Sequence, residues 1–406
     1  MMLKKLKNNH KFAAMIGTAL EYYDMSLYGF MTPLLVIIFL PDMPKLNAII
    51  LTFIVLPIGI LIRPLGALFI GKIGDNYGRK IGLIIGISGM ACVTGLTGLL
   101  PTYSDVGILA PILMLICRIL QGFFVAGEYN GGAIFVLEHS KQNTRGLSSG
   151  FYCAFTVLGI LTASGVTTLI SYLPQEYWRL PYILGFVTGL IGLYMRKHLV
   201  ETPEFIAYKD MPPIKTSAIV KNYKPILQAI GVAGFFSALY NFHTVLMISF
   251  IPIVTSLTTS DMMYINFKTT LIYMVALPIF GYIADKITFR RSMHYAAITT
   301  IIVSYPLILL ITLNNPHYIF LMKAVFAIIT AWFVGPFHAW IQSLFSVKQR
   351  YTAISVSYSI GSQLGGMIPA TSLWLWQSTG SFIAIASLLI FWAIIASLTL
   401  SSKVQK

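Results

Sequence analysis

The stretch Gly71-Lys72-Ile73-Gly74-Asp75-Asn76-Tyr77-Gly78-Arg79-Lys80 lies between two apolar segments and places an acid among basic residues. A degenerate copy, Gly281-Tyr282-Ile283-Ala284-Asp285-Lys286, follows in an equivalent setting. The offset is 281 − 71 = 210 for the glycine and 285 − 75 = 210 for the aspartate. A repeat that spans about half of the chain predicts two similar membrane bundles in parallel orientation. Such an arrangement is typical of a transporter.

The composition is that of a membrane protein, with 57% hydrophobic residues, 10% charged residues and a mean hydropathy of +0.79. A helix that crosses a bilayer needs about 20 mostly apolar residues. We count twelve such spans, so the sequence predicts an all-α membrane protein with twelve transmembrane helices in two six-helix bundles. The spans lie at roughly 12–40, 48–71, 81–101, 106–138, 146–173, 177–196, 225–255, 264–284, 293–313, 317–345, 350–375 and 379–400.

The distribution of Lys and Arg predicts the orientation, because basic residues in short loops tend to stay cytoplasmic. With the N-terminus inside, its side collects 22 of the 28 Lys and Arg residues. Both termini are therefore expected in the cytoplasm, and the first span is expected to act as an uncleaved anchor in a bacterial inner membrane. The formal net charge of +15 then mostly reflects topology.

A polar segment at 197–224 interrupts the apolar pattern and is rich in charged residues and prolines. We interpret it as a cytoplasmic linker between two bundles, at 1–196 and 225–406. Cys92, Cys117 and Cys153 fall inside apolar spans without paired metal-ligand spacing, and we expect them to be small core residues.

Motifs of other protein classes are lacking or incomplete. The basic residues are scattered over loops, which disfavours a nucleic-acid partner. Gly66 to Lys72 matches most of a phosphate-binding loop, but Ile73 occupies the place of the metal-binding hydroxyl. We find no His-Glu-x-x-His motif and no convincing nucleophile and base. The sequence therefore predicts no enzyme activity, no cofactor and no metal.

The first span carries Glu21 and Asp24 with Tyr22 and Tyr28 nearby. At about 100° per residue the two acids lie roughly 60° apart, so one face of this helix is polar. Ionisable groups in a bilayer cost about 2.5–3.5 kcal/mol each and need a partner or a use. Two acids on one face suit reversible proton binding. The alternative, left open, is an ion pair with Arg63 or Arg118 that holds helices together.

The fourth span contains Arg118, Gln121, Glu128 and Tyr129. Arg118 and Glu128 point about 80° apart and nearly three turns along the helix, so both are placed to border one cavity at different depths. A guanidinium stays charged and forms bidentate bonds, so Arg118 is a candidate for a substrate carboxylate. A salt bridge from Arg118 to Glu21, Asp24 or Glu128 is the alternative.

The second half contributes fewer charges to its spans, and its ionisable candidates are His243, Lys323 and His338. We rank the histidines below the acids as proton carriers, because a lone membrane histidine is more often a packing residue. Tyr240 and Trp332 are among the aromatic residues that are suited to a cation-π contact with a quaternary ammonium. Packing or an interfacial position is the simpler explanation for any one of them.

Several segments of the first half form a specific signature when they are taken together. They are Gly17-Thr18-Ala19-Leu20-Glu21-Tyr22-Tyr23-Asp24, Arg63-Pro64-Leu65-Gly66, Gly71 to Lys80, Arg118-Ile119-Leu120-Gln121-Gly122, Gly127-Glu128-Tyr129, Trp178-Arg179-Leu180-Pro181-Tyr182 and Glu201-Thr202-Pro203-Glu204-Phe205. With these segments the chain resembles the metabolite:proton symporters of the major facilitator superfamily, which include proline/betaine, α-ketoglutarate, citrate and shikimate transporters. The second half matches less distinctly, because Thr288 takes the place that corresponds to Gly78.

The resemblance implies alternating access around a site at the membrane midplane. The charged turn would then work as a cytoplasmic latch, in which glycines permit close helix approach and Asp75 meets a helix N-terminus or Arg145. The alternative is a turn that only determines topology. The expected gating residues are Gly71, Asp75, Gly78, Arg79, Lys80, Arg145 and Asp285.

We therefore expect proton-coupled import of a small organic solute, first a zwitterionic osmoprotectant of the proline/betaine type, by a chain that works as a monomer in the lipid bilayer. A di- or tricarboxylate is the competitor, motivated by Arg63, Arg118 and Lys323. A membrane sensor without transport is the alternative of another class. The expected proton-coupling residues are Glu21, Asp24 and Glu128, and the expected substrate-binding residues are Tyr22, Tyr28, Arg63, Arg118, Gln121, Tyr129, Tyr240 and Trp332.

Overall fold

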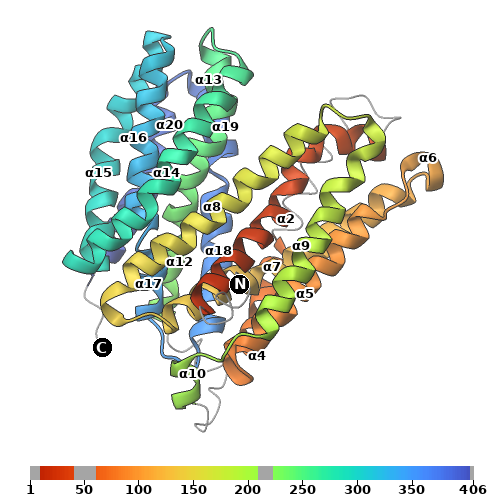
Figure 1. Cartoon of the computed structure of the whole chain (residues 1–406). Coiled ribbons are helices and arrows are strands. Elements are labelled where there is room, and N and C mark those ends of the chain that lie inside the picture. Colours follow the sequence, from red (N-terminus) through yellow and green to blue (C-terminus); the bar gives the residue numbers. More distant parts are fainter. Residues whose placement is uncertain (1–9, 41–60, 209–222, 403–406) are drawn as a thin grey trace. The chain divides into compact units, whose positions relative to one another are not determined.

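The computed structural model describes residues 10–40, 61–208 and 223–402, and within these ranges every regular element is helical (Figure 1). The first part of the chain contains α2(His10–Phe39), α4(Arg63–Asn76), α5(Arg79–Gly98), α6(Tyr103–Val106), α7(Leu109–Glu138), η1(Gln142–Thr144), α8(Arg145–Ile170), η2(Gln175–Arg179), α9(Leu180–Lys197) and α10(Pro203–Tyr208). The second part contains α12(Tyr223–Asn241), η3(Phe242–Leu246), α13(Met247–Val254), α14(Thr259–Ile287), α15(Phe289–Leu309), η4(Leu310–Leu313), α16(Pro316–Val334), α17(Phe337–Ser343), α18(Arg350–Gly366), α19(Ile368–Thr379) and α20(Phe382–Ser401).

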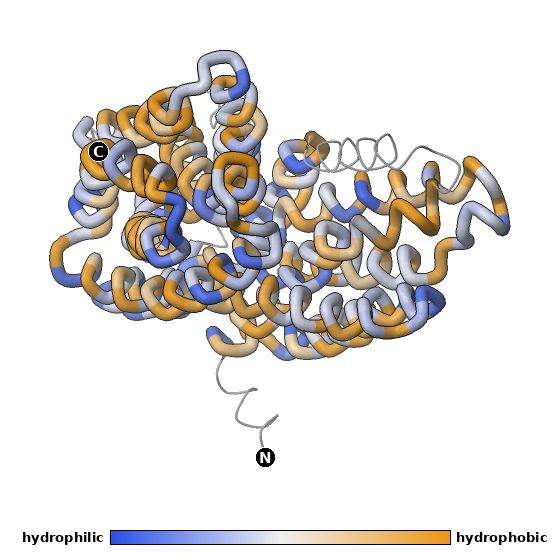
Figure 2. Tube along the Cα trace, turned by 90° about the horizontal axis from the view of Figure 1, so that it is seen from above, coloured by the Kyte–Doolittle hydropathy of each residue, from blue (hydrophilic) through white to orange (hydrophobic). Residues whose placement is uncertain are grey.

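The helices have the length and composition of membrane spans. Within the described ranges, nine of them meet both criteria. The other three expected spans correspond to α2, to α4, and to α18 with α19, although residues 48–60 of the second expected span lie outside the described residues. Hydrophobic residues run along the whole length of the helices (Figure 2). The predicted all-α architecture with twelve membrane spans is confirmed.

The chain forms two compact units that do not coincide with its two halves. Unit 1 comprises residues 1–139, 155–214 and 347–356, and unit 2 comprises residues 140–154, 215–346 and 357–406. The first residues of α8 therefore belong to unit 2, and the first residues of α18 belong to unit 1. The expected linker at 197–224 is described only up to residue 208 and from residue 223, and the division at this segment stays a prediction.

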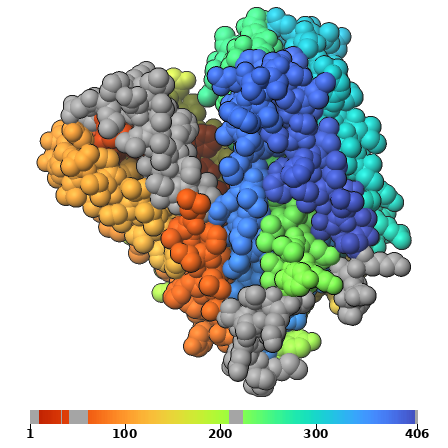
Figure 3. Space-filling model, turned by 180° about the vertical axis from the view of Figure 1, so that it is seen from behind, coloured from red at the N-terminus to blue at the C-terminus, as the bar shows by residue number. Residues whose placement is uncertain are grey.

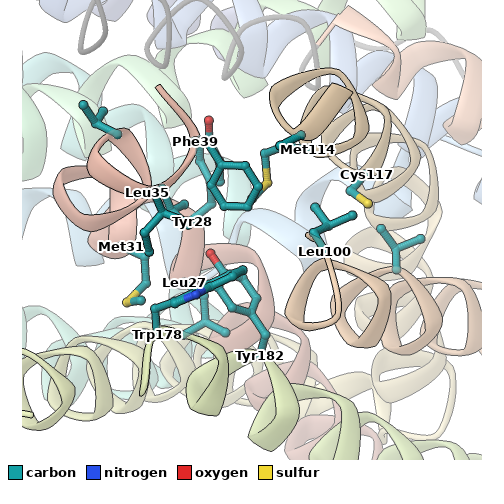
Figure 4. Close-up of a cluster of buried hydrophobic side chains, with 14 of the residues drawn as sticks. Leu27, Tyr28, Met31, Leu35, Phe39, Leu100, Met114, Cys117, Trp178 and Tyr182 are labelled. Carbon is teal, nitrogen blue, oxygen red and sulfur yellow. The ribbon is translucent and has the colours of Figure 1, made fainter. Parts of the chain in front are cut away.

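Unit 1 is built around α5 and α7. α5 packs against α7 and α9, α4 packs against α7, and α2 packs against α9 and α7. Apolar side chains of these helices form a core in which Tyr28 and Phe39 of α2 lie with Cys117 of α7 and Tyr182 of α9 (Figure 4). Polar residues of α2 and α7 are thereby held in a buried environment.

Unit 2 is built around α14, α15, α16 and α20. α14 packs against α16, and α15 packs against both α16 and α20. Figure 3 shows α15 in cyan beside α20 in dark blue, although more than 70 residues separate their ends. A π-helical turn, η3, joins α12 to α13.

Helix starts follow the local sequence. Pro64, Pro181 and Pro316 each occupy one of the first two positions of a helix, where a missing N–H costs nothing. In the loop before α7, the Thr102 backbone N–H and hydroxyl both donate to Asp105, and these bonds lower the pKa of the Asp105 carboxyl.

The three cysteines are free thiols with different surroundings. Cys117 and Cys153 are buried, as predicted, whereas Cys92 is exposed on the surface of α5. The prediction of a core position was therefore wrong for Cys92, because its side chain points away from the packed face of its helix.

Candidate functional site

The charged turn between α4 and α5 binds the first residues of α18 within unit 1. Asp75 Oδ1 accepts a hydrogen bond from the Tyr351 N–H at 3.1 Å, and Oδ2 accepts from the Thr352 N–H at 2.9 Å and the Thr352 hydroxyl at 2.7 Å. Helix N-termini carry partial positive charge, which stabilises a carboxylate. Of the two partners expected for Asp75, a helix N-terminus is present within unit 1, and an interaction with Arg145 stays a prediction.

The second copy of the turn makes the same kind of contact in unit 2. Asp285 accepts hydrogen bonds from the backbone N–H groups of Gly146 at 2.7 Å and Leu147 at 2.9 Å, at the start of α8. The capped positions are themselves related by a constant offset, since 351 − 146 = 205 and 352 − 147 = 205. Each repeated aspartate therefore caps one helix of its own unit.

Glycine at the start of each turn permits this close approach. A Cβ added to Gly71 would lie 2.7 Å from the Thr352 Cα, and a Cβ added to Gly281 would overlap the Gly146 carbonyl. A larger residue at either position would push the capped helix away from its aspartate. The expected role of glycine in the turn thus has a structural basis at both copies.

The residue before the next helix has the same unusual backbone in both copies. Gly78 begins α5 with φ 118° and ψ 150°, and Thr288 begins α15 with φ 106° and ψ 140°. This conformation favours glycine. The shape of the turn is therefore retained in the second half although Thr288 replaces the glycine.

An ion network surrounds the first turn. Arg79 Nη1 lies 2.9 Å from Asp75 Oδ1, and Arg79 Nε lies 3.4 Å from Glu138 Oε2. Arg350 Nη1 lies 2.8 Å from Glu138 Oε1 and 2.6 Å from Glu204 Oε2. Arg79 and Glu138 are completely or almost completely buried, so their charges depend on one another for compensation.

The segment Glu201-Thr202-Pro203-Glu204-Phe205 is attached to the same turn. Glu201 accepts hydrogen bonds from the backbone N–H groups of Arg79 and Lys80, each at 3.1 Å, and thereby caps α5. The Thr202 hydroxyl donates to Glu138 at 2.5 Å. Glu138, Glu201 and Glu204 were not among the functional residues expected from the sequence. Their position next to loops that are otherwise basic was a feature of the sequence from which a role could have been predicted.

Tyr351 inserts its ring between three helices of unit 1. It is fully buried, and a Cβ added to Gly74 of α4 or Gly131 of α7 would overlap its ring or hydroxyl. A Cβ added to Gly82 of α5 would lie 2.9 Å from the ring. The Tyr351 hydroxyl has no hydrogen-bond partner among the described residues. Tyr351 therefore contributes to the packing of these three helices through the shape of its ring.

The two expected coupling acids on α2 are buried. Neither oxygen of Glu21 has a hydrogen-bond partner among the described residues, and Asp24 Oδ1 also has none. Gln121 Nε2 donates to Thr94 Oγ1 at 3.3 Å, and the Thr94 side chain also interacts with Asp24. Asp24, expected to couple protons, and Gln121, expected to bind the substrate, are thus connected through Thr94.

Glu128, the third expected coupling acid, forms an ion pair with Arg196 of α9, and both side chains are fully buried. Room for this pair comes from glycines. A Cβ on Gly17 would lie 2.8 Å from Arg196 Nη2, and a Cβ on Gly86 would overlap Glu128 Oε2. Arg196, expected only as one of the basic residues on the cytoplasmic side, also compensates a buried acid. A glutamate inside an apolar span, such as Glu128, needs a compensating cation, and this requirement could have predicted a role for Arg196.

Arg118 lies over the ring of Tyr28, with 4.1 Å between its Cζ and the ring centroid. It is 7% exposed, and its Nε and Nη2 have no hydrogen-bond partner in the part of the chain that the structure describes. The Tyr182 hydroxyl is also buried, and it has no hydrogen-bond partner among the described residues either. No ion pair joins Arg118 to Glu21, Asp24 or Glu128 within the described residues. The internal salt bridge that was the alternative for Arg118 is therefore not present among the described residues.

The remaining expected substrate residues lie in several places. Tyr22 contacts Tyr129 with 5.4 Å between ring centroids, and Arg63 Nη2 donates to Met25 Sδ at 3.7 Å. In unit 2, Tyr240 contacts Tyr273, whereas Trp332 donates to the Ser292 hydroxyl at 3.1 Å and stacks on Phe280. Trp332 therefore already has packing partners of its own. The described residues contain no cluster of His, Cys, Asp and Glu that could hold a metal ion.

Comparison with known proteins identifies the class to which this architecture belongs. The model of the Major Facilitator Superfamily matches residues 14–370, and the chain is a member of that superfamily of membrane transporters. The prediction from the resemblance is confirmed at this level.

Curated relatives are similar over most of their length. The chain is 30% identical to the proline/betaine transporter of Salmonella typhimurium over 95% of the chain and 81% of the relative. It is 30% identical to the glycine betaine/proline/ectoine/pipecolic acid transporter OusA of Dickeya dadantii, with the same coverage. It is 32% identical to a putative proline/betaine transporter of Staphylococcus aureus over 91% of the chain and 82% of the relative.

Solved structures show the same fold. The proton:xylose symporter XylE bound to 6-bromo-6-deoxy-D-glucose matches with a TM-score of 0.68 and 15% identity, over 98% of this chain and 95% of that chain. A double Trp mutant of XylE matches with a TM-score of 0.77 and 14% identity, over 97% and 94% of the two chains. At this identity the similarity concerns the fold.

Proposed function

We propose that this protein imports a zwitterionic solute of the proline/betaine type together with protons, by alternating access, as a monomer with both termini in the cytoplasm. The names of the relatives and the resemblance in the first half support the substrate class. The single observation that carries the proposal is Arg118, a buried guanidinium without a carboxylate partner among the described residues.

Arg118 is suited to bind the carboxylate of such a solute. Its unpaired N–H groups are available for two parallel hydrogen bonds, which a carboxylate accepts and a sugar hydroxyl does not. The Tyr28 ring holds the guanidinium plane from one face. Asp24 interacts electrostatically with Arg118, so an acid lies near enough to balance its charge when the carboxylate is absent.

The positive end of a zwitterion needs an acid or an aromatic face. In unit 1, Asp24 and the edge-to-face pair of Tyr22 and Tyr129 offer both kinds of group. The solute carries no net charge, so a proton provides the driving force. One proton that moves through about 100 mV releases about 2.3 kcal/mol, enough for roughly fifty-fold accumulation.

Glu21 and Asp24 are the proposed proton acceptors, with Glu128 as the third. A buried carboxyl without hydrogen-bond donors is more stable when protonated, and it ionises when a cation or water reaches it. Arg196 and Arg63 interact electrostatically with Glu21, and Arg196 pairs with Glu128. A change in either interaction during the cycle would bind or release a proton.

The repeated turn is the proposed cytoplasmic gate. Asp75 and Asp285 each cap a helix, through Tyr351 and Thr352 and through Gly146 and Leu147. These contacts stabilise the state in which they form and are lost when the capped helices move away. Lys80 and Arg145 take part in this gate through the start of α5 and the start of α8.

Uptake into proteoliposomes under an imposed pH gradient tests the function. We expect accumulation of proline or betaine by the wild type and a loss of at least about tenfold in uptake by Arg118→Gln, which removes a charge-assisted pair. Arg179→Gln is the matched control, because Arg179 also lies over an aromatic ring, at 4.5 Å from Trp178, but its Nη2 donates to the Leu100 carbonyl.

Other outcomes separate the alternatives. Strong uptake of a dicarboxylate without uptake of proline or betaine would replace the substrate class. Ligand-dependent conformational change without any flux would indicate a sensor. Equal uptake by Arg118→Gln and wild type would remove Arg118 from the binding site.

A further inference from the structure

A buried lysine in unit 2 has no part in the mechanism proposed above. Lys323 of α16 is 0% exposed, and its Nζ donates to the His243 carbonyl at 2.5 Å and to Asn266 Oδ1 at 3.0 Å. These contacts connect α16 to η3 and α14. Both acceptors are neutral.

No carboxylate compensates the charge of this amine. Within the described residues, no ion pair involves Lys323. A buried ammonium without an acid is much less stable than the same group in water, whereas the neutral amine is tolerated. Gain and loss of a proton are therefore more closely balanced here than at an exposed lysine.

The π-helical turn η3 explains why the His243 carbonyl is available. In an α-helix the Met247 N–H would donate to the His243 carbonyl, four residues before it. Here the Met247 N–H donates to the Phe242 carbonyl, one residue further back. Lys323 occupies the place of the diverted N–H. π turns occur frequently at functional sites, because they change the hydrogen bonding of a helix locally.

The His243 side chain lies in the same place and is equally unusual. It is fully buried, and neither ring nitrogen has a hydrogen-bond partner among the described residues. Its ring contacts the rings of Tyr240 and Tyr273, with centroid distances of 6.0 Å and 5.7 Å. Lys323 is the charged group that interacts with it electrostatically.

We propose that Lys323 and His243 form a second proton-binding site, in unit 2, separate from the acids of α2 and α7. Lys323 carries the exchangeable proton, and the imidazole nitrogens next to it offer a second position for a proton. Binding of the proton strengthens the Nζ contact to the π turn, and its loss weakens that contact. The ligand class is the proton itself, and its use in coupling rests on the proposed transport function.

In the described part of the chain, no carboxylate forms an ion pair or a hydrogen bond with Lys323. On α14, Asp261 is exposed within the cap formed with Thr258, and Lys268 is exposed over the Tyr264 ring at 4.1 Å. The basic residues Arg290 and Arg291 lie at the other end of α15, and η4 has no titratable side chain. Among the titratable side chains of the elements that pack against α16, His243 of η3 contacts the rings of Tyr240 of α12 and Tyr273 of α14.

Thermal unfolding of the purified full-length chain in detergent tests the proposal without any transport. The midpoint is measured from about pH 6 to about pH 9 for the wild type, Lys323→Met and Lys323→Arg. Methionine holds no proton, and arginine stays protonated with its donors retained. Lys268→Met is the matched control for loss of an exposed lysine on the neighbouring helix.

We expect the wild type to gain stability relative to both Lys323 variants as the pH rises. The reason is that the unfolded lysine keeps its proton in this range, while the buried amine releases it, so the unfolded state binds more protons. The difference in midpoint should change by about 3 °C or more over the range, and the Lys268→Met difference should stay constant.

Differences that do not change with pH would overturn the proposal, whatever their sign, because Lys323 would then keep one protonation state and act as a structural clamp. If Lys323→Met does not fold, the comparison of Lys323→Arg with the wild type decides alone. Absence of solute uptake by the wild type would overturn the proposed function and leave this measurement valid.

Discussion

Two glycines of α7 make room for different side chains, and one of these side chains is Tyr351. Gly127 and Gly131 have the small-xxx-small spacing that lets helices approach closely. In the structure a Cβ on Gly127 would overlap Ile70 of α4, whereas a Cβ on Gly131 would overlap the Tyr351 hydroxyl. The spacing predicts close contact of helices, but it does not say which side chain fills the space beside each glycine. For Gly131 that side chain comes from a residue more than 200 positions away in the sequence.

Replacement of Gly131 by alanine tests the contact with Tyr351. We expect Gly131→Ala to lower the free energy of unfolding by about 1–3 kcal/mol, because the added methyl group overpacks a filled space. Tyr351→Phe should be nearly neutral, because the hydroxyl has no hydrogen-bond partner among the described residues. Thermal unfolding of the purified variants measures both effects.

Gly165→Ala is the matched control, since nothing lies within 4 Å of a Cβ at that position of α8. An alanine at an open helical site is expected to be neutral or slightly stabilising. If Gly131→Ala and Gly165→Ala unfold at the same midpoint, Tyr351 does not require the space at Gly131.

At the scale of elements, the two charged turns keep one geometry with different sequences. Asp75 and Asp285 both cap a helix, and Gly78 and Thr288 both precede a helix with positive φ. The sequence comparison detected the aspartates but interpreted Thr288 as a departure. The backbone kept its shape because the helix ends and the aspartate cap restrain it, so the threonine is held in a conformation that glycine adopts more easily.

Thr288→Gly is expected to raise the free energy of unfolding by about 1 kcal/mol. Relief of a positive φ contributes about 1–3 kcal/mol, and the added freedom of glycine in the unfolded chain offsets part of it. The lost cap is weak, because the Arg291 N–H lies 3.4 Å from Thr288 Oγ1. The midpoint of thermal unfolding measures the change.

Gly78→Ala provides the opposite comparison, because it adds strain at φ 118° and a Cβ that would overlap Glu201. It should lower the midpoint clearly. A lower midpoint for Thr288→Gly would mean that the threonine is not strained in the folded chain.

For the whole molecule, most of the residues expected to couple protons and bind solute are distributed over several helices of unit 1, whereas Tyr240 and Trp332 lie in unit 2. Asp24 and Arg118 interact electrostatically, Gln121 reaches Asp24 through Thr94, and Glu128 pairs with Arg196. Residues of α2, α5, α7 and α9 thus form one buried polar system. Movement of any of these helices would change the partners of an acid, which is how a transport cycle can be linked to protonation.

Neutral variants of the three acids test this coupling. Glu21→Gln and Asp24→Asn are expected to lose gradient-driven accumulation while they retain exchange of solute across the membrane, because the amide can form hydrogen bonds but cannot carry the proton. Glu128→Gln is expected to lose accumulation and about 3–5 kcal/mol of stability, because Arg196 is left buried without its acid. Uptake and counterflow in proteoliposomes distinguish the two activities.

Asp105→Asn is the control, since Asp105 caps an exposed loop and should not affect coupling. The coupling assignment is wrong if all three acid variants retain accumulation in response to the pH gradient.

The class of fold follows from the amino-acid sequence, because the length of the hydrophobic runs and the repeated charged turn depend on local chemistry. The acids and Arg118 were located in the same way, since a charge inside an apolar span is visible without any partner. The pairing of these groups was seen first in the folded chain: Arg196 with Glu128, the Thr352 helix end with Asp75, and Lys323 with the π turn. Partners such as these come from distant helices, and a buried charge takes whichever compensating group the packing brings within hydrogen-bond distance.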